Sequence, residues 1–367
     1  MKKLVCALAA LLAATVALTA PAQARDTRVT LQVRGVTYAG HAVLVHGQVP
    51  TGVGRVRLER RVGGHWKLLR RVSVNAGAYR TRIALTRGVA RLRAQAGTFT
   101  SAIQSFDVVV PPSDGCGVRP VKADGTLWSC SFDDEFSGTA LDRTKWVPQT
   151  DFGSGTAAAH ACNVDSPSVI DVSGGTLNLS IRKVATPVSC AKEPSGPTNY
   201  IAGGVMTYGL FSQQYGRFEA RIRTAATLYR GLQETFWLWP DLYSTLTTGS
   251  AFVPGEIDVA EFYSQYPTLV IPFLHYGYSL PIPGVNTAWN CSAARGVFNT
   301  YTLTWGPSRI EIQVNGRTCL VNTAASAAYK QKYMMVLTAL LGVGANAYDG
   351  RAPIPETMNV DYVRAWK

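Results

Sequence analysis

Three carboxylate residues lie close together in segment 255–262, where Glu256, Asp258 and Glu261 follow one another within six positions. Alternate side chains of a β-strand share a face, so Glu256 and Asp258 would point the same way. Strict alternation would place Glu261 on the opposite face. One extra residue, a β-bulge near Val259-Ala260, would return it to the face of Glu256. We therefore expect three carboxylates in one cleft, where they must share protons, as acid/base chemistry requires.

Such a group of carboxylates favours cleavage of a glycosidic bond with retention of configuration. Two carboxyl groups from one strand can approach to roughly 5–5.5 Å, the separation found in retaining glycosidases. One carboxylate must be ionised to attack the sugar, and one carboxyl must be protonated to release the leaving group. Asp258, between the two glutamates, could hydrogen-bond Glu256 and hold the proton in place. The pattern is short, however, and an exposed acidic edge strand would also show it.

Two tryptophans and a histidine are expected on neighbouring strands. Trp237 and Trp239 are two residues apart and would share a strand face. Their indole rings offer an apolar platform for sugar rings, and core packing is the alternative. His275 falls on the next predicted strand, close to the carboxylates if the two strands form a hairpin. A lone histidine on an apolar strand can equally be structural.

The elements that position these residues are predicted to be strands. Apolar and polar residues alternate over 176–181, 216–222 and 309–314, and Asn315-Gly316 then supplies a tight hairpin turn. Only residues 324–332 are expected to form a turn or two of helix. About 250 residues of β structure in one domain indicate an all-β fold, a large two-sheet sandwich with one curved face open to a chain-like ligand.

Further motifs occur in order along the same region. They are Phe132-Asp133-Asp134-Glu135-Phe136, Leu141-Asp142, Trp146, Tyr215-Gly216-Arg217-Phe218-Glu219-Ala220-Arg221, Phe236-Trp237-Leu238-Trp239-Pro240 after Gly231, Tyr301, Trp305 and Val360-Asp361-Tyr362-Val363-Arg364. With the carboxylate strand they resemble glycoside hydrolase family 16, the β-jelly-roll enzymes that cut β-glucans and galactans. The resemblance covers most of 128–367.

The resemblance implies roles for the three carboxylates. Glu256 would be the nucleophile, Asp258 the assisting acid and Glu261 the acid/base. The six-residue, bulged form of the strand is similar to that of laminarinase-like members of the family. Relatives often carry a histidine at the position of His275, facing the cleft. The mechanism implied requires no metal or other cofactor.

Other residues are weaker candidates for substrate or metal contact. Asn163 lies where relatives place a polar residue that lines the cleft, and Trp289 is on a loop that could border it. Arg221 could reach a sugar hydroxyl or pair with Glu219. Many relatives bind a structural calcium ion with a carboxylate of the closing strand and backbone oxygens, and Asp361 matches that position.

The chain departs from its relatives just before the tryptophan strand. Where many have Trp-Pro-Ala, it has Gln233-Glu234-Thr235. The neighbouring sugar subsites, and so the substrate, are therefore open. Glu234 could contact sugar hydroxyls or be a salt-bridged strand residue, and we favour the second interpretation.

The chain is predicted to divide at the stiff Pro111-Pro112 linker. Residues 25–110 show short alternating stretches separated by turn signals, which indicate a small immunoglobulin-like β-sandwich. Residues 111–127 form a linker and lead-in with a cysteine, and 128–367 form the jelly-roll domain. No catalytic group is expected in 25–110.

Positive charge is concentrated in the first module. Residues 25–110 contain 15 Arg or Lys and three acidic residues, a balance of +12 out of a net charge of +13. The excess suggests attraction to an anionic surface such as an acidic cell-wall polymer. An arginine-rich, merely solvated face is the alternative, and nothing resembles a nucleic-acid module.

The first residues indicate export. Lys2 and Lys3 precede an apolar run over 4–20, and Ala22-Gln23-Ala24 suggests cleavage before Arg25, which makes 1–24 a signal peptide. An uncleaved anchor is the alternative, and no later segment is long enough to span a membrane. We therefore expect a secreted or cell-wall-associated monomer.

Six cysteines remain after the signal, and an even number in an exported chain favours disulfides. Fifteen pairings are possible, among which the sequence does not choose. We expect sequential pairing, which closes one local loop per pair: Cys116 with Cys130, Cys162 with Cys190, and Cys291 with Cys319.

The leading functional hypothesis is retaining endo-hydrolysis of a polysaccharide, first of all a β-1,3-glucan. Within the family, a galactan or other cell-wall polysaccharide could be the substrate, or transglycosylation could replace hydrolysis. From another class, the protein could be a surface lectin that binds without cutting, or an adhesin that acts through its basic module. The complete set of three carboxylates argues against a lectin.

Overall fold

The computed structural model describes residues 28–150, 152–241, 255–276, 280–324 and 329–367. Its regular structure is almost entirely β-strand, and the helical element among these residues is the short 3-10 turn η2 (Gly344–Asn346). No described helix has the length and apolar character needed to cross a membrane. The expected signal peptide lies outside the described residues, as does the middle of the helical turn expected over 324–332.

The chain divides into two compact units. Unit 1 extends to Val110 and includes residues 123–126, while unit 2 comprises residues 111–122 and 127–367. Each unit has its own cluster of buried hydrophobic side chains, and no residue belongs to both clusters.

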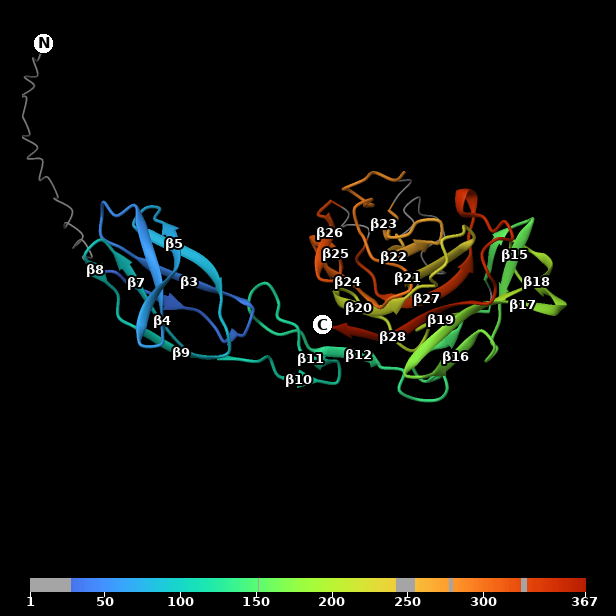
Figure 1. Cartoon of the computed structure of the whole chain (residues 1–367), viewed down its shortest axis with the longest axis horizontal. Helices are drawn as coiled ribbons and strands as arrows, with labels where there is room; N and C mark the ends of the chain where they lie inside the picture. The colour runs from blue at the N-terminus through green and yellow to red at the C-terminus, as the bar shows by residue number, and fades with distance from the viewer. Residues whose placement is uncertain (1–27, 151, 242–254, 277–279, 325–328) are drawn as a thin grey trace, which may run out of the picture. The chain divides into compact units, whose positions relative to one another are not determined.

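Unit 1 is built from two antiparallel sheets around one core. Its three-stranded sheet has the order β1 (Gln32–Val33), β3 (Ala42–Gln48), β6 (Ala78–Ala84). Its six-stranded sheet has the order β2 (Thr37–Tyr38), β9 (Gln104–Val109), β7 (Gly88–Ala96), β4 (Arg55–Val62), β5 (His65–Ser73), with β8 (Phe99–Thr100) beside β7; one pair, β2 with β9, is parallel (Figure 1).

Unit 2 is a larger two-sheet sandwich. Its eleven-stranded sheet has the order β14 (Gly153–Thr156), β15 (Ala159–Asn163), β18 (Gly196–Ala202), β17 (Thr176–Cys190), β28 (Glu356–Trp366), β20 (Gly216–Arg223), β24 (Asn299–Gly306), β25 (Arg309–Val314), β26 (Arg317–Asn322), with β12 (Cys130–Asp134) beside β28 and β16 (Ile170–Ser173) beside β17. A two-stranded ribbon, β10 (Ser113–Asp114) with β11 (Gly117–Val118), precedes it.

The second sheet of unit 2 carries the carboxylate strand. Its order is β13 (Val147–Pro148), β19 (Gly204–Met206), β27 (Tyr333–Leu341), β21 (Leu232–Pro240), β22 (Ile257–Tyr263), β23 (Ile271–Leu274). Figure 1 shows β21, β22 and β27 side by side in this sheet. The all-β sandwich predicted from the alternating patterns is therefore confirmed for this unit.

Alternation explains why these segments form a sandwich. On β20, Phe218, Ala220 and Ile222 are fully buried, because residues two apart all face the layer between the sheets. The predicted hairpin also forms, since Asn315 and Gly316 join β25 to β26. Both residues adopt the positive φ angles, 49° and 75°, that a two-residue hairpin turn requires.

The six cysteines pair sequentially, as predicted. The disulfides join Cys116 to Cys130, Cys162 to Cys190, and Cys291 to Cys319, with Cα–Cα distances of 5.4, 5.0 and 5.2 Å. Each bond therefore connects neighbouring segments of unit 2.

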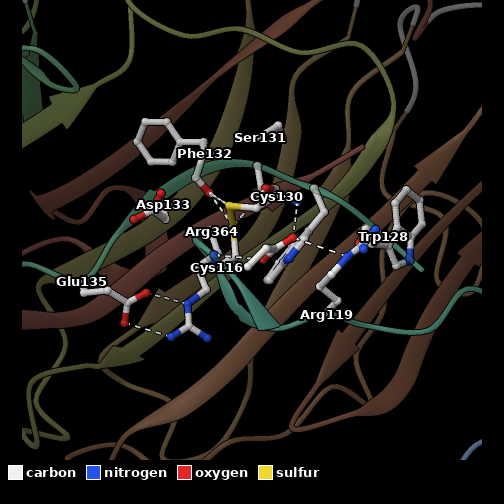
Figure 2. Close-up of a disulfide and its surroundings, with 12 residues drawn as sticks. Cys116, Arg119, Trp128, Cys130, Ser131, Phe132, Asp133, Glu135 and Arg364 are labelled. Atoms are coloured by element: carbon white, nitrogen blue, oxygen red, sulfur yellow. Dashed lines mark hydrogen bonds and ion pairs between the residues drawn. A yellow bond between two sulfur atoms is a disulfide. The ribbon is translucent and has the colours of Figure 1, made fainter. Parts of the chain in front are cut away.

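The first disulfide fastens the lead-in segment to unit 2. Figure 2 shows Cys116 and Cys130 bonded beside the closing strand. Arg119 Nε donates to the carbonyl oxygen of Trp128 at 2.7 Å. Nearby, Arg364 of β28 forms a two-bond ion pair with Glu135, at 2.6 and 2.8 Å. The lead-in and the last strand are thus held together at this end of the sandwich.

Candidate active site

A cavity of about 540 Å³ opens on the face of β21, β22 and β27 that points away from the core. All three predicted carboxylates line it, together with both predicted tryptophans. The full set is Gln149, Phe152, Lys192, Met206, Gln233, Thr235, Trp237, Trp239, Glu256, Asp258, Glu261, Met334, Val336 and Leu340. Carboxylates beside an apolar wall are the kind of lining that a sugar polymer can use, because its rings have apolar faces and polar edges.

A shift in strand register brings Glu261 to this face. Between β21 and β22, Trp237 is opposite Asp258 and Phe236 is opposite Ala260, which leaves Val259 without a partner. The pairing of β22 with β23 is also irregular between Asp258 and Glu261. The irregularity lies where the sequence pattern required an extra residue, so the three carboxylates share one side of the strand.

A glycine fixes the backbone just before the first carboxylate. A Cβ atom on Gly255 would lie 1.4 Å from the carbonyl oxygen of His275, so only glycine fits there. The His275 amide donates to the carbonyl oxygen of Glu256 at 3.0 Å, and the Tyr333 hydroxyl donates to that of Gly255 at 2.5 Å. These contacts hold the backbone of Glu256 against the neighbouring strands.

Glu256 and Asp258 form a hydrogen-bonded pair of buried carboxyl groups. Burial raises the pKa of Glu256 well above its ordinary value, and the nearby charge of Asp258 raises it further. Burial also raises the pKa of Asp258, as does the charge of Glu261. Because two adjacent carboxylates resist ionising together, the pair retains one proton between them.

His275 contacts the middle carboxylate. Its Nε2 lies 2.9 Å from Asp258 Oδ2, and an oxygen of Glu256 is within 4.8 Å of both groups. Burial lowers the pKa of His275, while the charges of Glu256 and Glu261 raise it. The histidine is on the predicted side of the strand pair, and its partner is Asp258 rather than the acid/base Glu261.

Glu261 has two neutral hydrogen-bond donors. Gln233 Nε2 donates to Glu261 Oε1 at 2.9 Å, and the Tyr263 hydroxyl donates to the same oxygen at 3.2 Å. Burial raises the pKa of Glu261, while Gln233, His275 and Tyr263 act in the opposite direction. Glu261 can therefore hold a proton near neutral pH on the oxygen that these donors do not occupy.

The tryptophans form an aromatic wall beside the carboxylates. Trp237 and Trp239 meet edge to face, with ring centroids 5.8 Å apart, and both are partly exposed. Trp237 Nε1 donates to Thr338 Oγ1 at 3.3 Å. This bond fixes the indole plane, so at least one ring face is held in place at the edge of the cavity.

Comparison with known proteins identifies the family. Residues 157–364, more than half of the chain, match the model of the glycosyl hydrolases family 16. The chain belongs to this family. In the language of that family, unit 2 is a family 16 domain, and the cavity lies on its carboxylate strand.

Curated relatives agree with this assignment. Glucan endo-1,3-beta-glucosidase A1 of Niallia circulans is 28% identical over 268 residues, which cover 64% of this chain and 37% of that protein. Keratan-sulfate endo-1,4-beta-galactosidase of Sphingobacterium multivorum is 27% identical over 249 residues, 66% of this chain and 54% of that protein. The chain therefore spans less than two thirds of the length of either relative.

A solved structure shows the same fold. The crystal structure of SCLam, a non-specific endo-beta-1,3(4)-glucanase from family 16, superposes with a TM-score of 0.56 at 23% identity. The match covers 70% of this chain and 99% of that chain. At this identity the likeness establishes the β-jelly-roll fold of the family 16 domain.

Three of the predicted contact residues are not among those that line the cavity. Arg221 lies on β20 in the other sheet, where its Nη1 binds Asp361 Oδ2 at 2.5 Å, so its expected contacts with sugar or with Glu219 are wrong. Asn163 is buried, 2% exposed, beside Gly204. Trp289 is 52% exposed on its loop.

The described residues do not fit a calcium site at Asp361. Its carboxylate oxygen is bound by the guanidinium of Arg221, which already neutralises the charge that a cation would need. In the described part of the chain, Asp361 belongs to no group of three or more potential metal-ligating side chains. The expectation of calcium at this residue is therefore not supported.

Glu234 is a salt-bridged strand residue, as favoured from the sequence. Arg295 Nη2 binds Glu234 Oε2 at 2.5 Å, and the amide of Ala225 donates to Glu234 Oε1 at 2.7 Å. Both side chains of the ion pair are at most 5% exposed. Glu234 therefore faces the core, while its neighbours Gln233 and Thr235 face the cavity.

Sequence reasoning missed the two donors to Glu261. Tyr263 follows Glu261 by two residues and so shares its strand face, a signal that alternation could have provided. Gln233 was noted only as a departure from relatives. Its partnership with Glu261 depends on the pairing of β21 with β22, in which Gln233 is opposite Tyr263.

Proposed function

We propose that this family 16 chain is a retaining endo-glycosidase that hydrolyses internal β-linkages of a polysaccharide. The observation that supports this most directly is the convergence of Glu256, Asp258 and Glu261 in one cavity with Trp237 and Trp239. The names of the curated relatives, an endo-glucosidase and an endo-galactosidase, support the same class of reaction.

The reaction proceeds in two displacements. In the first, a carboxylate oxygen of Glu256 bonds to the anomeric carbon as the glycosidic bond breaks, and Glu261 donates its proton to the leaving oxygen. In the second, Glu261 accepts a proton from water as the water oxygen attacks the anomeric carbon. The bond to Glu256 then breaks, and the new hemiacetal has the original configuration.

The paired carboxyl groups prepare the nucleophile. Glu256 must be ionised to attack, although burial raises its pKa. The proton that it shares with Asp258 can move onto Asp258, whose pKa is also raised by burial and by the charge of Glu261. His275, 2.9 Å from Asp258, holds that carboxyl group in position. Asp258 and His275 are therefore positioning residues for Glu256.

The first substrate to test is a β-1,3-glucan. The name of the Niallia circulans relative favours this linkage, and the register shift at Val259 supports a place among the bulged, laminarinase-like members. A galactan is the second candidate. It is favoured by the galactosidase relative of nearly equal identity and by Gln233, which stands where many relatives have tryptophan.

We further propose that the chain acts outside the cell. Three disulfides support this, because such bonds persist in oxidising compartments. The apolar run over 4–20, which precedes Ala22-Gln23-Ala24, would direct the export.

The decisive experiment measures the release of reducing sugar from laminarin, lichenan, agarose and arabinogalactan by the wild type and by Glu256→Gln. We expect activity on a β-glucan that falls on the order of 10⁴-fold or more in the variant. Activity on a galactan alone would keep the mechanism and replace the linkage. Retained binding without any cleavage would overturn the proposal in favour of a lectin.

A further inference from the structure

The three-stranded sheet of unit 1 carries a groove of about 760 Å³. It follows β1, β3 and β6, of which Figure 1 labels β3. Its lining residues are Thr30, Gln32, Arg34, Leu44, His46, Gly47, Gln48, Ser73, Asn75, Ala78, Tyr79 and Arg80. The volume falls in the range of about 300–1,000 Å³ that ligand sites occupy. All of these residues belong to unit 1, so the groove is a feature of that unit by itself.

One row of polar side chains crosses all three strands. Gln32 is paired with His46, and His46 is paired with Arg80. Directly opposed residues of antiparallel strands point to the same face. Val45 and Tyr79, the neighbours of this row along the chain, are 0% and 2% exposed and face the core. The row therefore lies on the outer face, where it can contact a ligand.

The groove combines permanent positive charge with neutral hydrogen-bonding groups. Arg34 and Arg80 contribute two guanidinium groups, and Gln32, Gln48 and Asn75 contribute amides. No carboxylate is among the residues that line it. Guanidinium groups match carboxylate and phosphate oxygens, while amides can both donate to and accept from hydroxyl groups.

The acidic residues of unit 1 lie elsewhere. Between residues 28 and 110 they are Glu59 on β4 and Asp107 on β9, both in the six-stranded sheet. Glu59 is already bound by Arg57 at 3.1 Å and by Arg93 at 2.8 Å. The positive potential of the groove is therefore available to an anionic ligand.

We propose that this groove binds an acidic polysaccharide, a polymer whose repeating units carry both hydroxyl groups and a carboxylate or phosphate. Charge complementarity selects the anion, and the row of amides selects the hydroxyls. Binding of such a polymer would raise the local concentration of the polysaccharides around it for the family 16 domain on the same chain. The binding itself does not depend on the proposed hydrolysis.

A nucleic acid fits the groove less well. Single-stranded nucleic acids are held largely by bases that stack on exposed aromatic side chains. The aromatic residue of the groove is Tyr79, which is 2% exposed and whose hydroxyl donates to the carbonyl oxygen of Thr30 at 2.7 Å. It offers no ring face to a base.

The test compares two double variants of the full chain that remove the same charge. Arg34→Gln/Arg80→Gln changes the groove, whereas Arg61→Gln/Arg91→Gln changes two exposed arginines on β4 and β7 of the other sheet. Dissociation constants are measured by affinity electrophoresis with polygalacturonate and with polyribitol phosphate, and far-UV circular dichroism checks folding. We expect the groove variant to bind either polymer about tenfold or more weakly and the control to bind like the wild type.

Three outcomes would overturn the proposal. An equal loss of affinity in both variants would show a diffuse attraction to the whole basic unit. Failure of the wild type to bind either polymer would remove the acidic polysaccharide as ligand. Displacement of bound polygalacturonate by an equal concentration of single-stranded oligonucleotide would assign the groove to nucleic acid. Loss in the groove variant alone, weakened further by salt, would support it.

Discussion

Glu256 and Glu261 are chemically the same residue, yet their surroundings separate their roles. Glu256 shares a proton with the carboxyl group of Asp258, while Glu261 receives hydrogen bonds from Gln233 and Tyr263. Burial raises the pKa of both glutamates. Only the neighbours differ, so the behaviour of the site with pH can be altered one neighbour at a time.

Replacing Gln233 with leucine should move the alkaline limb of the pH profile to higher pH. The amide stabilises the ionised form of Glu261, and without it the pKa of that carboxyl rises further above its ordinary value. The acid/base then keeps its proton to higher pH. The profile of kcat/KM for Gln233→Leu tests this, with Gln313→Leu in the other sheet as a control that should leave the limb unchanged. An unmoved limb in Gln233→Leu would contradict the role of the amide.

Glu256→Gln should stabilise the fold while it abolishes activity. Between the ordinary glutamate pKa, about 4.3, and the raised pKa of Glu256, the folded chain binds more protons than the unfolded chain. Stability therefore falls as pH rises through this window, and the amide removes that fall. We expect a gain of about 1 kcal/mol near neutral pH, or about 2–4 °C in Tm.

Thermal unfolding followed at several pH values checks this expectation. The difference in Tm between Glu256→Gln and the wild type should widen as pH rises and vanish in acid. Asp349→Asn provides the opposite case, because Arg351 and Arg230 hold the pKa of Asp349 below its ordinary value. A difference that is independent of pH would argue against a buried, proton-sharing Glu256.

At the scale of the element, the carboxylate strand depends on an irregular register. Val259 has no partner on β21, and this single unpaired residue places Glu261 beside Asp258 on the cavity side. The neighbouring Gly255 allows the backbone to approach His275. The site is therefore a property of how β22 meets β21 and β23, since a regular ladder would have turned Glu261 toward the core.

Two disulfides of equal span offer a matched comparison between elements. Cys162–Cys190 and Cys291–Cys319 both close loops with a sequence separation of 28. Loop-closure entropy then predicts that replacing either pair with serine costs about 3–4 kcal/mol of unfolding free energy. Cys190 precedes Lys192, which lines the cavity, whereas Cys291 and Cys319 lie away from it. We therefore expect a higher KM only for Cys162→Ser/Cys190→Ser.

Denaturant unfolding and steady-state kinetics on the same two variants check that expectation. Similar losses of stability with different values of KM would support a positioning effect of the first disulfide on the cavity. Equal changes in KM for both variants would show that the kinetic effect comes from general loosening of the sandwich.

At the scale of the whole molecule, the chain consists of two units with separate hydrophobic cores. The carboxylate cavity lies entirely in unit 2, and the basic groove lies entirely in unit 1. Since no core residue is common to the two clusters, removal of one unit leaves the core of the other complete.

A chain that lacks residues 1–110 should therefore keep its activity on short, soluble oligosaccharides. It retains Cys116 and the lead-in that the first disulfide fastens to unit 2. Its binding to polygalacturonate should be lost, because the groove has been removed. Parallel assays of oligosaccharide cleavage and polymer binding test both statements. Loss of cleavage in a folded, truncated chain would show that the cavity requires unit 1.

Much of the fold follows from local patterns. Alternating residues over 216–222 and 309–314 predicted strands, and Asn315-Gly316 predicted their hairpin, because side-chain period and turn preference act over a few residues. Sequential disulfides were also predictable, since they join nearby segments. The carboxylate pattern identified the cavity for the same reason: its three members belong to one strand.

The partners of individual side chains could not be predicted in this way, because they depend on which strands become neighbours. Arg221 and Asp361 are 140 residues apart in the chain, and they meet because β20 pairs with β28. The hydrogen bond between Gln233 and Glu261 likewise requires β21 beside β22. The sequence by itself determined the strands, the turn and the three carboxylates. Only the tertiary structure decided what each side chain contacts, because contacts across a sheet depend on register and strand order rather than on local spacing.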